Sequence, residues 1–204
     1  MSKNIQNHRY ITGLDGLRAF SVLAVMAYHF NFNWAEGGFL GVDIFFVISG
    51  YLITSSILTQ KSELNFSLRR FWIRRIRRLL PAATLKGDAA ASIFYVSNWW
   101  FIFHKISYFD SFGSPSPLKN LWSLSIEEQF YIIWPLMLIA GIKIFKKRTK
   151  LSNAVFIAAL CSAVLMAVLY KPGEDPSRVY YGTDTRAFEL LIGGWLAIIY
   201  PIKK

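Results

Sequence analysis

Apolar runs separated by short polar or basic blocks dominate the pattern of this chain. A membrane-spanning helix needs about 20 mostly apolar residues, and four runs approach that length, with a fifth, shorter run of the same character. The five runs cover residues 17–32, 39–58, 126–145, 152–170 and 187–202. The pattern predicts an all-α, polytopic membrane helical bundle of about five hydrophobic segments. It occupies residues 10–202 and follows a short N-terminal tail of residues 1–9.

Basic residues cluster after the second and third runs, around residues 61–78 and 143–150. Loops rich in Lys and Arg lie on the cytoplasmic side of a membrane, so both blocks are expected there. With the basic residues at both ends of the chain also placed inside, 17 of the 23 Lys and Arg residues lie on one side. The sequence therefore predicts a multi-pass protein of the plasma membrane with a cytoplasmic N terminus.

This topology needs one more crossing between the two basic blocks, because both lie on the same side. The remaining candidate is residues 89–103, which is only 15 residues long and follows the polar stretch L-K-G-D. It is a poor span. Asn98, Trp99 and Trp100 at its outer end resemble an interfacial aromatic belt, and the G-S-P-S-P stretch of residues 113–117 is expected in an outer loop.

Composition favours a bilayer as solvent, because 54% of the 204 residues are hydrophobic and 17% are aromatic. The formal charge of +11 comes from blocks between apolar runs rather than from one continuous polar face, which argues against nucleic acid as a partner. Cys161 is the only cysteine, so one chain has neither a disulfide framework nor a cysteine-rich metal site. The first apolar run lacks a small-residue cleavage site and is expected to be a retained span.

The first apolar run contains His29, eleven residues after Arg18. Three helical turns bring both side chains to nearly the same face, about 16 Å apart along the axis, and Asp15 lies on that stripe too. An ionisable side chain at membrane depth is costly and indicates function, although a histidine paired with a neighbouring helix is the simpler alternative. Arg18 taken alone could equally extend to lipid phosphate.

The second run carries one carboxylate, Asp43, among small residues. Gly41, Ser49 and Gly50 permit close packing of helices. A buried carboxylate needs a partner, and His29 on the first helix is the nearest candidate at similar depth. A carboxylate that fixes the imidazole tautomer would make His29 a better general base.

Three further stretches carry candidate chemistry. The arginine-rich segment 69–81 is typical of an amphipathic anchor on anionic lipid, and it could also clamp the phosphates of a donor such as coenzyme A. Glu127 and Glu128 stand at the outer entrance of the third clear run with Tyr131 one turn beyond, which indicates an acceptor-side patch, although acids also complement a helix N terminus. The stretch 180–186, followed by Glu189, is either a solvated outer loop or a further charged site.

These stretches resemble, in order, the motifs of the acyltransferase-3 family. The motifs are the R-x10-H spacing from Arg18 to His29, G-V-D-I-F-F-V-I-S-G-Y, the arginine block ending in L-L-P, N-W-W, W-S-L-S-I-E-E-Q-F-Y and Y-G-T-D-T-R. The likeness covers nearly the whole chain and is greatest to the subgroup that O-acetylates peptidoglycan or related surface sugars. It implies transfer of an acyl group, usually acetyl, from a cytoplasmic acyl-coenzyme A to a hydroxyl of a cell-envelope carbohydrate. Acetyl-coenzyme A is then a donor substrate, with no permanently bound cofactor and no metal.

The resemblance also implies roles for individual residues. His29 is the central base, and Asp43 or Asp15 orients it. The acyl donor is expected to contact Arg18, Arg74, Arg75 and Ser49. The residues expected to orient the acceptor or relay the acyl group are Glu127, Glu128, Tyr131 and Tyr181. The expected partners are the lipid bilayer, the acyl donor, a carbohydrate acceptor and other membrane subunits.

The chain also departs from the family pattern. Family members place a membrane helix directly after L-L-P, whereas here Pro81 runs almost at once into the polar Lys86-Gly87-Asp88. The family domain has about ten helices, and this chain offers five. Two alternatives to an active enzyme therefore stay open: an inactive truncated fragment that associates with an intact acyltransferase, and a transporter of small anions.

Overall fold

The computed structural model describes residues 12–62, 67–69, 71–73, 95–109 and 121–201, and every regular element in these ranges is a helix. The long helices are α1 (Thr12–His29), α2 (Gly41–Ser62), α6 (Leu121–Ile144), α7 (Arg148–Leu169) and α9 (Thr183–Ile199). Shorter elements are the 3-10 helix η1 (Asn33–Leu40), α5 (Ser97–Phe103) and α8 (Ser177–Tyr181). The all-α prediction is confirmed for the described part of the chain.

Each expected hydrophobic run corresponds to a helix, with boundaries moved by a few residues. The first run ends early because Asn31 adopts a left-handed backbone with φ of 58°, and the amides of Asn31 and Phe32 bond back to the carbonyls of Tyr28 and Ala27. This is the Schellman arrangement that closes many helices, and asparagine tolerates its backbone angles. The candidate span 89–103 begins outside the described residues, and its described part contains only the seven-residue α5.

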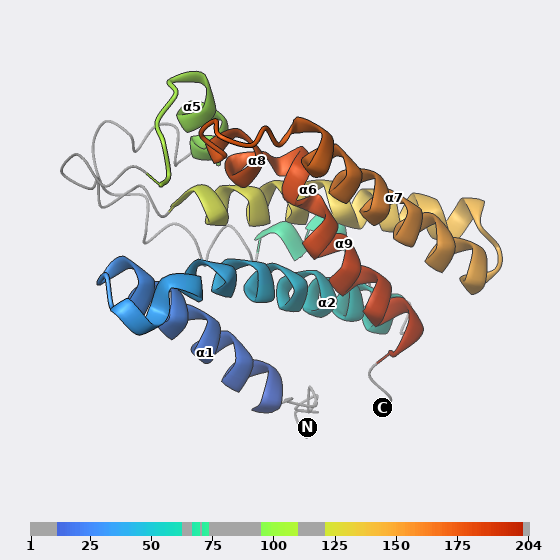
Figure 1. Ribbon diagram of the computed structural model, residues 1–204. Coiled ribbons are helices and arrows are strands. Elements are labelled where there is room, and N and C mark those ends of the chain that lie inside the picture. Colours follow the sequence, from blue (N-terminus) through green and yellow to red (C-terminus); the bar gives the residue numbers. More distant parts are fainter. Residues whose placement is uncertain (1–11, 63–66, 70, 74–94, 110–120, 202–204) are drawn as a thin grey trace.

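The helices pack as a bundle in which α9 lies along both α2 and α7, while α1 covers another side of α2 (Figure 1). The α2–α9 crossing depends on two glycines. A Cβ atom on Gly50 would overlap the carbonyl oxygen of Leu190, and one on Gly193 would overlap that of Val47. Backbone contact at this crossing is therefore possible only because neither glycine has a side chain.

A closed set of hydrogen bonds ties α5 to this bundle. Asn98 donates to Thr183 (2.9 Å), Thr183 to Gln129 (2.6 Å), and Gln129 back to the amide oxygen of Asn98 (3.0 Å). Asn98 is fully buried, so the prediction that it belongs to an interfacial belt is wrong, whereas Trp100 beside it is exposed. Buried amides need such partners, and these bonds hold the start of α9 against α6.

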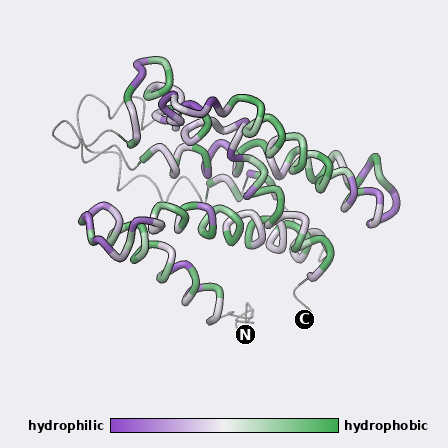
Figure 2. Tube along the Cα trace, viewed as in Figure 1, coloured by the Kyte–Doolittle hydropathy of each residue, from purple (hydrophilic) through white to green (hydrophobic). Residues whose placement is uncertain are grey.

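Large apolar side chains also cover the outside of the bundle. Phe20 and Leu23 on α1, Met137 on α6 and Val168 on α7 are all more than half exposed. Figure 2 shows hydrophobic residues along the helices and hydrophilic ones gathered at the α6–α7 turn and near η1. An exterior of this kind suits lipid tails rather than water.

Two helical stretches in the described ranges are long and apolar enough to cross a membrane, Asn33–Thr59 and Arg148–Leu169. The other expected spans do not meet that test of length and composition. The described residues thus confirm the all-helical prediction and contain two helical stretches that could cross a membrane.

Candidate functional site

His29 stands on the last turn of α1, where it is exposed and bonds to the helix backbone. Its Nδ1 lies 2.8 Å from the carbonyl oxygen of Val25, one turn earlier. A carbonyl oxygen only accepts, so this bond requires the hydrogen on Nδ1, and a neutral ring with that hydrogen has an unprotonated Nε2. This is the form that a general base requires.

A cavity of about 340 Å³ runs along α1 to His29. On α1 it is lined from Ser21, one turn beyond Arg18, through Val25 to His29. The eight residue steps from Ser21 to His29 make this wall about 12 Å long. The opposite wall is formed by α2, α6 and the loop that contains Tyr108, and it includes Glu127. The structure therefore places His29 and Glu127, which are 98 positions apart in the sequence, on the walls of one cavity.

Glu127 is buried at this cavity wall and its Oε1 accepts two hydrogen bonds. Ser49 Oγ donates from α2 at 2.6 Å, and the Tyr131 hydroxyl donates from the next turn of α6. Charge-assisted bonds of this kind are strong and fix the carboxylate. Glu127, Tyr131 and Ser49 thus form one cluster, which we call the Glu127 cluster. Ser49 was predicted on the donor side, but its hydroxyl is committed to Glu127.

Glu128 is also buried on α6, but it is not among the residues that line the His29 cavity. Tyr181 is fully buried as well, packed against Phe101 and Trp122, and its hydroxyl has no hydrogen-bond partner among the described residues. Burial raises the pKa of Tyr181 above its ordinary value. The structure therefore separates Glu128 and Tyr181 from the lining of this cavity.

Tyr108 also lines the cavity, although nothing in the sequence marked it as a candidate site residue. Its ring lies edge-on to His29 at 6.1 Å between centroids and packs on Tyr180 at 4.4 Å. Burial raises the pKa of Tyr108 to about 12, so its hydroxyl stays protonated at neutral pH. The loop motif F-H-K-I-S-Y-F around it carries no recognisable chemical signature.

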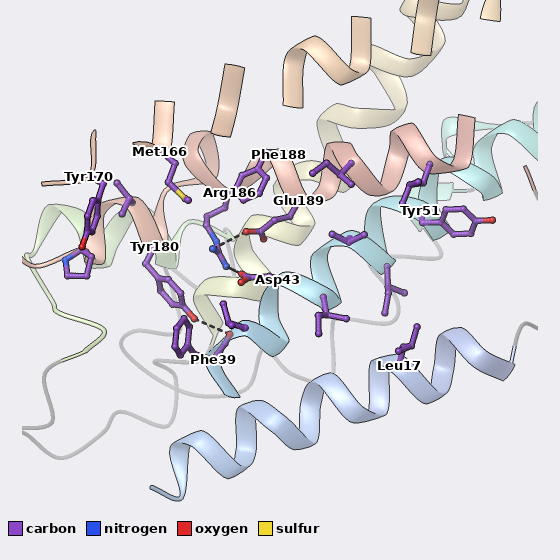
Figure 3. A pocket seen from close by; sticks show the side chains of 18 of the residues that line it. Leu17, Phe39, Asp43, Tyr51, Met166, Tyr170, Tyr180, Arg186, Phe188 and Glu189 are labelled. Carbon is purple, nitrogen blue, oxygen red and sulfur yellow. Dashed lines mark hydrogen bonds and ion pairs between the residues drawn. The ribbon is translucent and has the colours of Figure 1, made fainter. Parts of the chain in front are cut away.

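Asp43 pairs with Arg186 of α9, not with His29 as the sequence suggested. Arg186 Nη2 contacts Asp43 Oδ1, and Arg186 Nη1 lies 2.9 Å from Glu189 Oε1 (Figure 3). The guanidinium also lies over the Tyr180 ring at 4.9 Å. A buried carboxylate gains more from a guanidinium than from a neutral imidazole, which explains the choice of partner.

Arg186 and Glu189 are nearly inaccessible, at 5% and 2% exposure, so the interpretation of this stretch as a solvated loop is wrong. One signal was available in the sequence: Asp43 needed a cation at membrane depth, and Arg186 is an arginine at the start of an apolar run. Neither Arg186 nor Glu189 was selected from the sequence as a site residue.

Arg18 stays at the far end of α1 from His29. It pairs loosely with Asp15 at 3.8 Å, and its guanidinium carbon lies 5.3 Å from the centre of the Phe45 ring. Asp15 is therefore about 21 Å along the helix from His29 and does not orient it. Arg74 and Arg75 lie outside the described residues, so their predicted contact with the donor stays a prediction.

The described helices thus combine an apolar exterior with a cavity that is lined by a histidine and a buried glutamate. The family profile described as an acyltransferase domain matches residues 11–204, and the chain belongs to this family, acyltransferase 3.

Two curated relatives carry names that specify an acceptor. The chain is 62% identical to the putative peptidoglycan O-acetyltransferase YrhL of Bacillus subtilis (strain 168) over 225 residues, which is all of this chain and 36% of the relative. It is 56% identical to the peptidoglycan O-acetyltransferase OatA of Listeria monocytogenes over 97% of this chain and 35% of the relative. A putative O-acetyltransferase of Staphylococcus aureus (strain COL) is 49% identical over 96% of this chain and 36% of the relative. No solved structure gives a significant match.

The chain spans about a third of the length of these curated relatives. The matched stretches also contain positions that this chain lacks. The match to the Bacillus subtilis relative extends over 225 positions against 204 residues here, which leaves at least 21 without a counterpart. That number is close to the length of one membrane-spanning helix. That a helix is missing after Pro81 stays a prediction.

Proposed function

We propose that this chain forms the catalytic membrane portion of an O-acyltransferase that moves an acetyl group from cytoplasmic acetyl-coenzyme A to a hydroxyl of a cell-envelope carbohydrate. The observation that supports it best is the cavity between the Arg18 end of α1 and His29. In the proposed topology the N terminus is cytoplasmic and five segments lie in the plasma membrane, so this cavity leads from the donor side toward the outer surface.

The cavity suits a small acyl group. A volume of about 340 Å³ lies at the lower end of the range for small-molecule sites, and its walls are apolar apart from a few polar side chains. A short acyl chain with the sulfur-bearing end of a thioester fits this description. The bulky nucleotide part of coenzyme A stays at the cytoplasmic face, where Arg18, Arg74 and Arg75 supply positive charge.

The proposed chemical step uses His29 as general base. Nε2 takes the proton from the acceptor hydroxyl as that oxygen attacks the carbonyl carbon of the thioester. The carbon–sulfur bond then breaks, and the imidazolium returns the proton to the thiolate, which leaves as coenzyme A. The Glu127 carboxylate stabilises the positive charge that His29 carries during the step.

Names of the relatives support the acceptor class. Two of them are called peptidoglycan O-acetyltransferases, which favours a hydroxyl on peptidoglycan over other surface carbohydrates. Tyr108 at the cavity wall adds an aromatic ring against which a bound sugar or acyl group can pack.

The test measures acetyl esters on peptidoglycan in cells that lack other O-acetyltransferases. One strain expresses this chain, and a second expresses the chain with a membrane-spanning helix inserted after Pro81. Acetyl esters in both strains support the proposal for the chain as it stands. Esters only in the second strain mean that this chain is an inactive fragment, and esters in neither contradict the proposed acceptor.

A further inference from the structure

A second, larger cavity lies between α1 and α2 on one side and α7, α8 and α9 on the other (Figure 3). Its volume is about 860 Å³, and its walls are almost wholly apolar. It extends along α2 from Asp43 to Tyr51, which is about 12 Å of helix, and continues to Phe39 of η1. A volume in this range holds a ligand the size of a lipid chain or a large drug.

Three of the lining residues are ionisable, and they lie together: Asp43, Arg186 and Glu189. Figure 3 shows the Arg186 guanidinium between the two carboxyl groups, toward the Phe39 and Tyr180 end of the cavity. All other lining side chains are apolar or tyrosine. The cavity thus has a long hydrocarbon-like part and one polar end.

Hydrogen-bonding capacity at this polar end is incomplete. Arg186 Nε and Glu189 Oε2 are buried and have no hydrogen-bond partner among the described residues. Both side chains are more than nine-tenths buried, so bulk water does not satisfy them. Buried polar atoms almost always find a partner, and a donor and an acceptor left open beside a cavity indicate a ligand with matching groups.

Charge decides which matching groups fit. Two carboxyl groups surround one guanidinium, so the site has no spare positive charge to hold a phosphate. Glu189 Oε2 accepts a hydrogen bond from a hydroxyl, and Arg186 Nε donates one to a hydroxyl, ether or ester oxygen. A neutral head group rich in hydroxyls supplies both.

We propose that this cavity binds a neutral amphiphile whose hydrocarbon chain lies along α2 and α9 and whose polyol head group, such as glycerol, bonds to Arg186 and Glu189. This binding does not depend on acyl transfer, and it uses none of the residues that line the His29 cavity.

The experiment uses the full chain in phosphatidylcholine nanodiscs and a monoacylglycerol that carries a photoreactive diazirine on its acyl chain. Mass spectrometry locates the labelled peptides. Labelling is expected in α2 and α9, and an excess of unlabelled monoacylglycerol should remove it, whereas lysophosphatidic acid should not. Ile44→Trp fills the cavity from α2 and should abolish the competed labelling. Ile132→Trp on the exposed face of α6 is the matched control and should leave it unchanged.

A head-group switch tests the polar end. Asp43→Asn with Glu189→Gln leaves no carboxyl group that can balance the Arg186 guanidinium, so lysophosphatidic acid should now compete with the probe. The proposal is overturned if labelling is spread evenly over the exposed faces of α1, α6 and α7, if Ile44→Trp leaves competed labelling intact, or if lysophosphatidic acid competes equally in the unmodified chain. Should the double variant lose its cooperative melting transition, the Ile44→Trp result decides alone.

Discussion

Ser49 of α2 donates a 2.6 Å hydrogen bond to the Glu127 carboxylate of α6, and both side chains are almost fully buried. This bond fixes the carboxylate at the wall of the His29 cavity. It joins α2 to α6 through two residues that are 78 positions apart in the sequence. The same hydrogen bond therefore stabilises the fold and positions a residue of the candidate site.

Ser49→Ala should therefore destabilise the fold by about 1–3 kcal/mol, because it removes one of the bonds to a buried carboxylate. The measurement is thermal unfolding in detergent, repeated for Glu127→Gln and for the double variant. Residues in direct contact couple by about 0.5–3 kcal/mol in such a cycle. Strictly additive effects of the two changes would mean that the bond does not form.

Blocking the His29 cavity should stop acyl transfer without unfolding the protein. Met26→Trp adds an indole to a cavity-lining position that is already half exposed, so the core is not disturbed. Leu23→Trp is the control, on the same helix and exposed, but outside the cavity lining. We expect donor turnover to fall in the first variant and to persist in the second. Equal turnover in the two would show that this cavity is not the path of the acyl group.

The α2–α9 crossing should tolerate no added side-chain atom. Gly50→Ala places a methyl group against the Leu190 carbonyl oxygen, and overpacking of this kind costs about 1–3 kcal/mol or more. Gly37→Ala is the matched control, since a Cβ there has nothing within 4 Å. A lower melting temperature for Gly50→Ala alone is the expected result. Equal melting temperatures for both variants would argue against backbone contact at the crossing.

The ion pair between Arg178 and Asp184 gives the fold a defined dependence on acid. Partial burial disfavours the charged form of Asp184, but the hydrogen bonds and charge of Arg178 outweigh it and hold the pKa of the carboxyl below its ordinary value. A carboxyl with a depressed folded pKa stabilises the fold above its unfolded pKa of about 3.9, and this contribution is lost as the pH falls through the folded pKa.

Melting temperatures from pH 6 down to pH 3 should therefore decline more steeply for the unmodified chain than for Asp184→Asn, which cannot titrate. The comparison isolates this group from the other acids. Parallel declines in the two proteins would mean that the pair with Arg178 contributes nothing.

The sequence predicted the helices well and their partners less well. Runs of apolar residues fix where a helix lies in a membrane protein, so each expected run coincides with a helix. The predicted partner of Asp43 was wrong. His29 was chosen because it was expected at a similar depth in the membrane, whereas the structure pairs Asp43 with Arg186, 143 positions away. Nothing local in the sequence encodes that pairing, and the polar stretch around Arg186 has the composition of a loop.

The hydrogen bond from Ser49 to Glu127 was not predicted, for a similar reason. Small residues in a membrane helix usually permit close packing, and Gly50 beside it does so, but the Ser49 hydroxyl finds Glu127. Glu127 and His29 were selected from the sequence because acids and a histidine near apolar runs are unusual, and their predicted roles stay predictions. Tyr108 was not, because a tyrosine in a loop is common.

The central claim is that His29 is the base for transfer of the acyl group. The most direct measurement is acetyl-coenzyme A turnover in membranes that contain this chain, compared between His29→Ala and His104→Ala. His104 is a matched control, since its Nδ1 also bonds the carbonyl one turn earlier, at 2.9 Å, but it lines neither of the two cavities. Turnover should fall by about 100-fold or more in His29→Ala and stay near the unmodified rate in His104→Ala. If the unmodified chain turns over the donor and His29→Ala keeps that rate, the account is wrong.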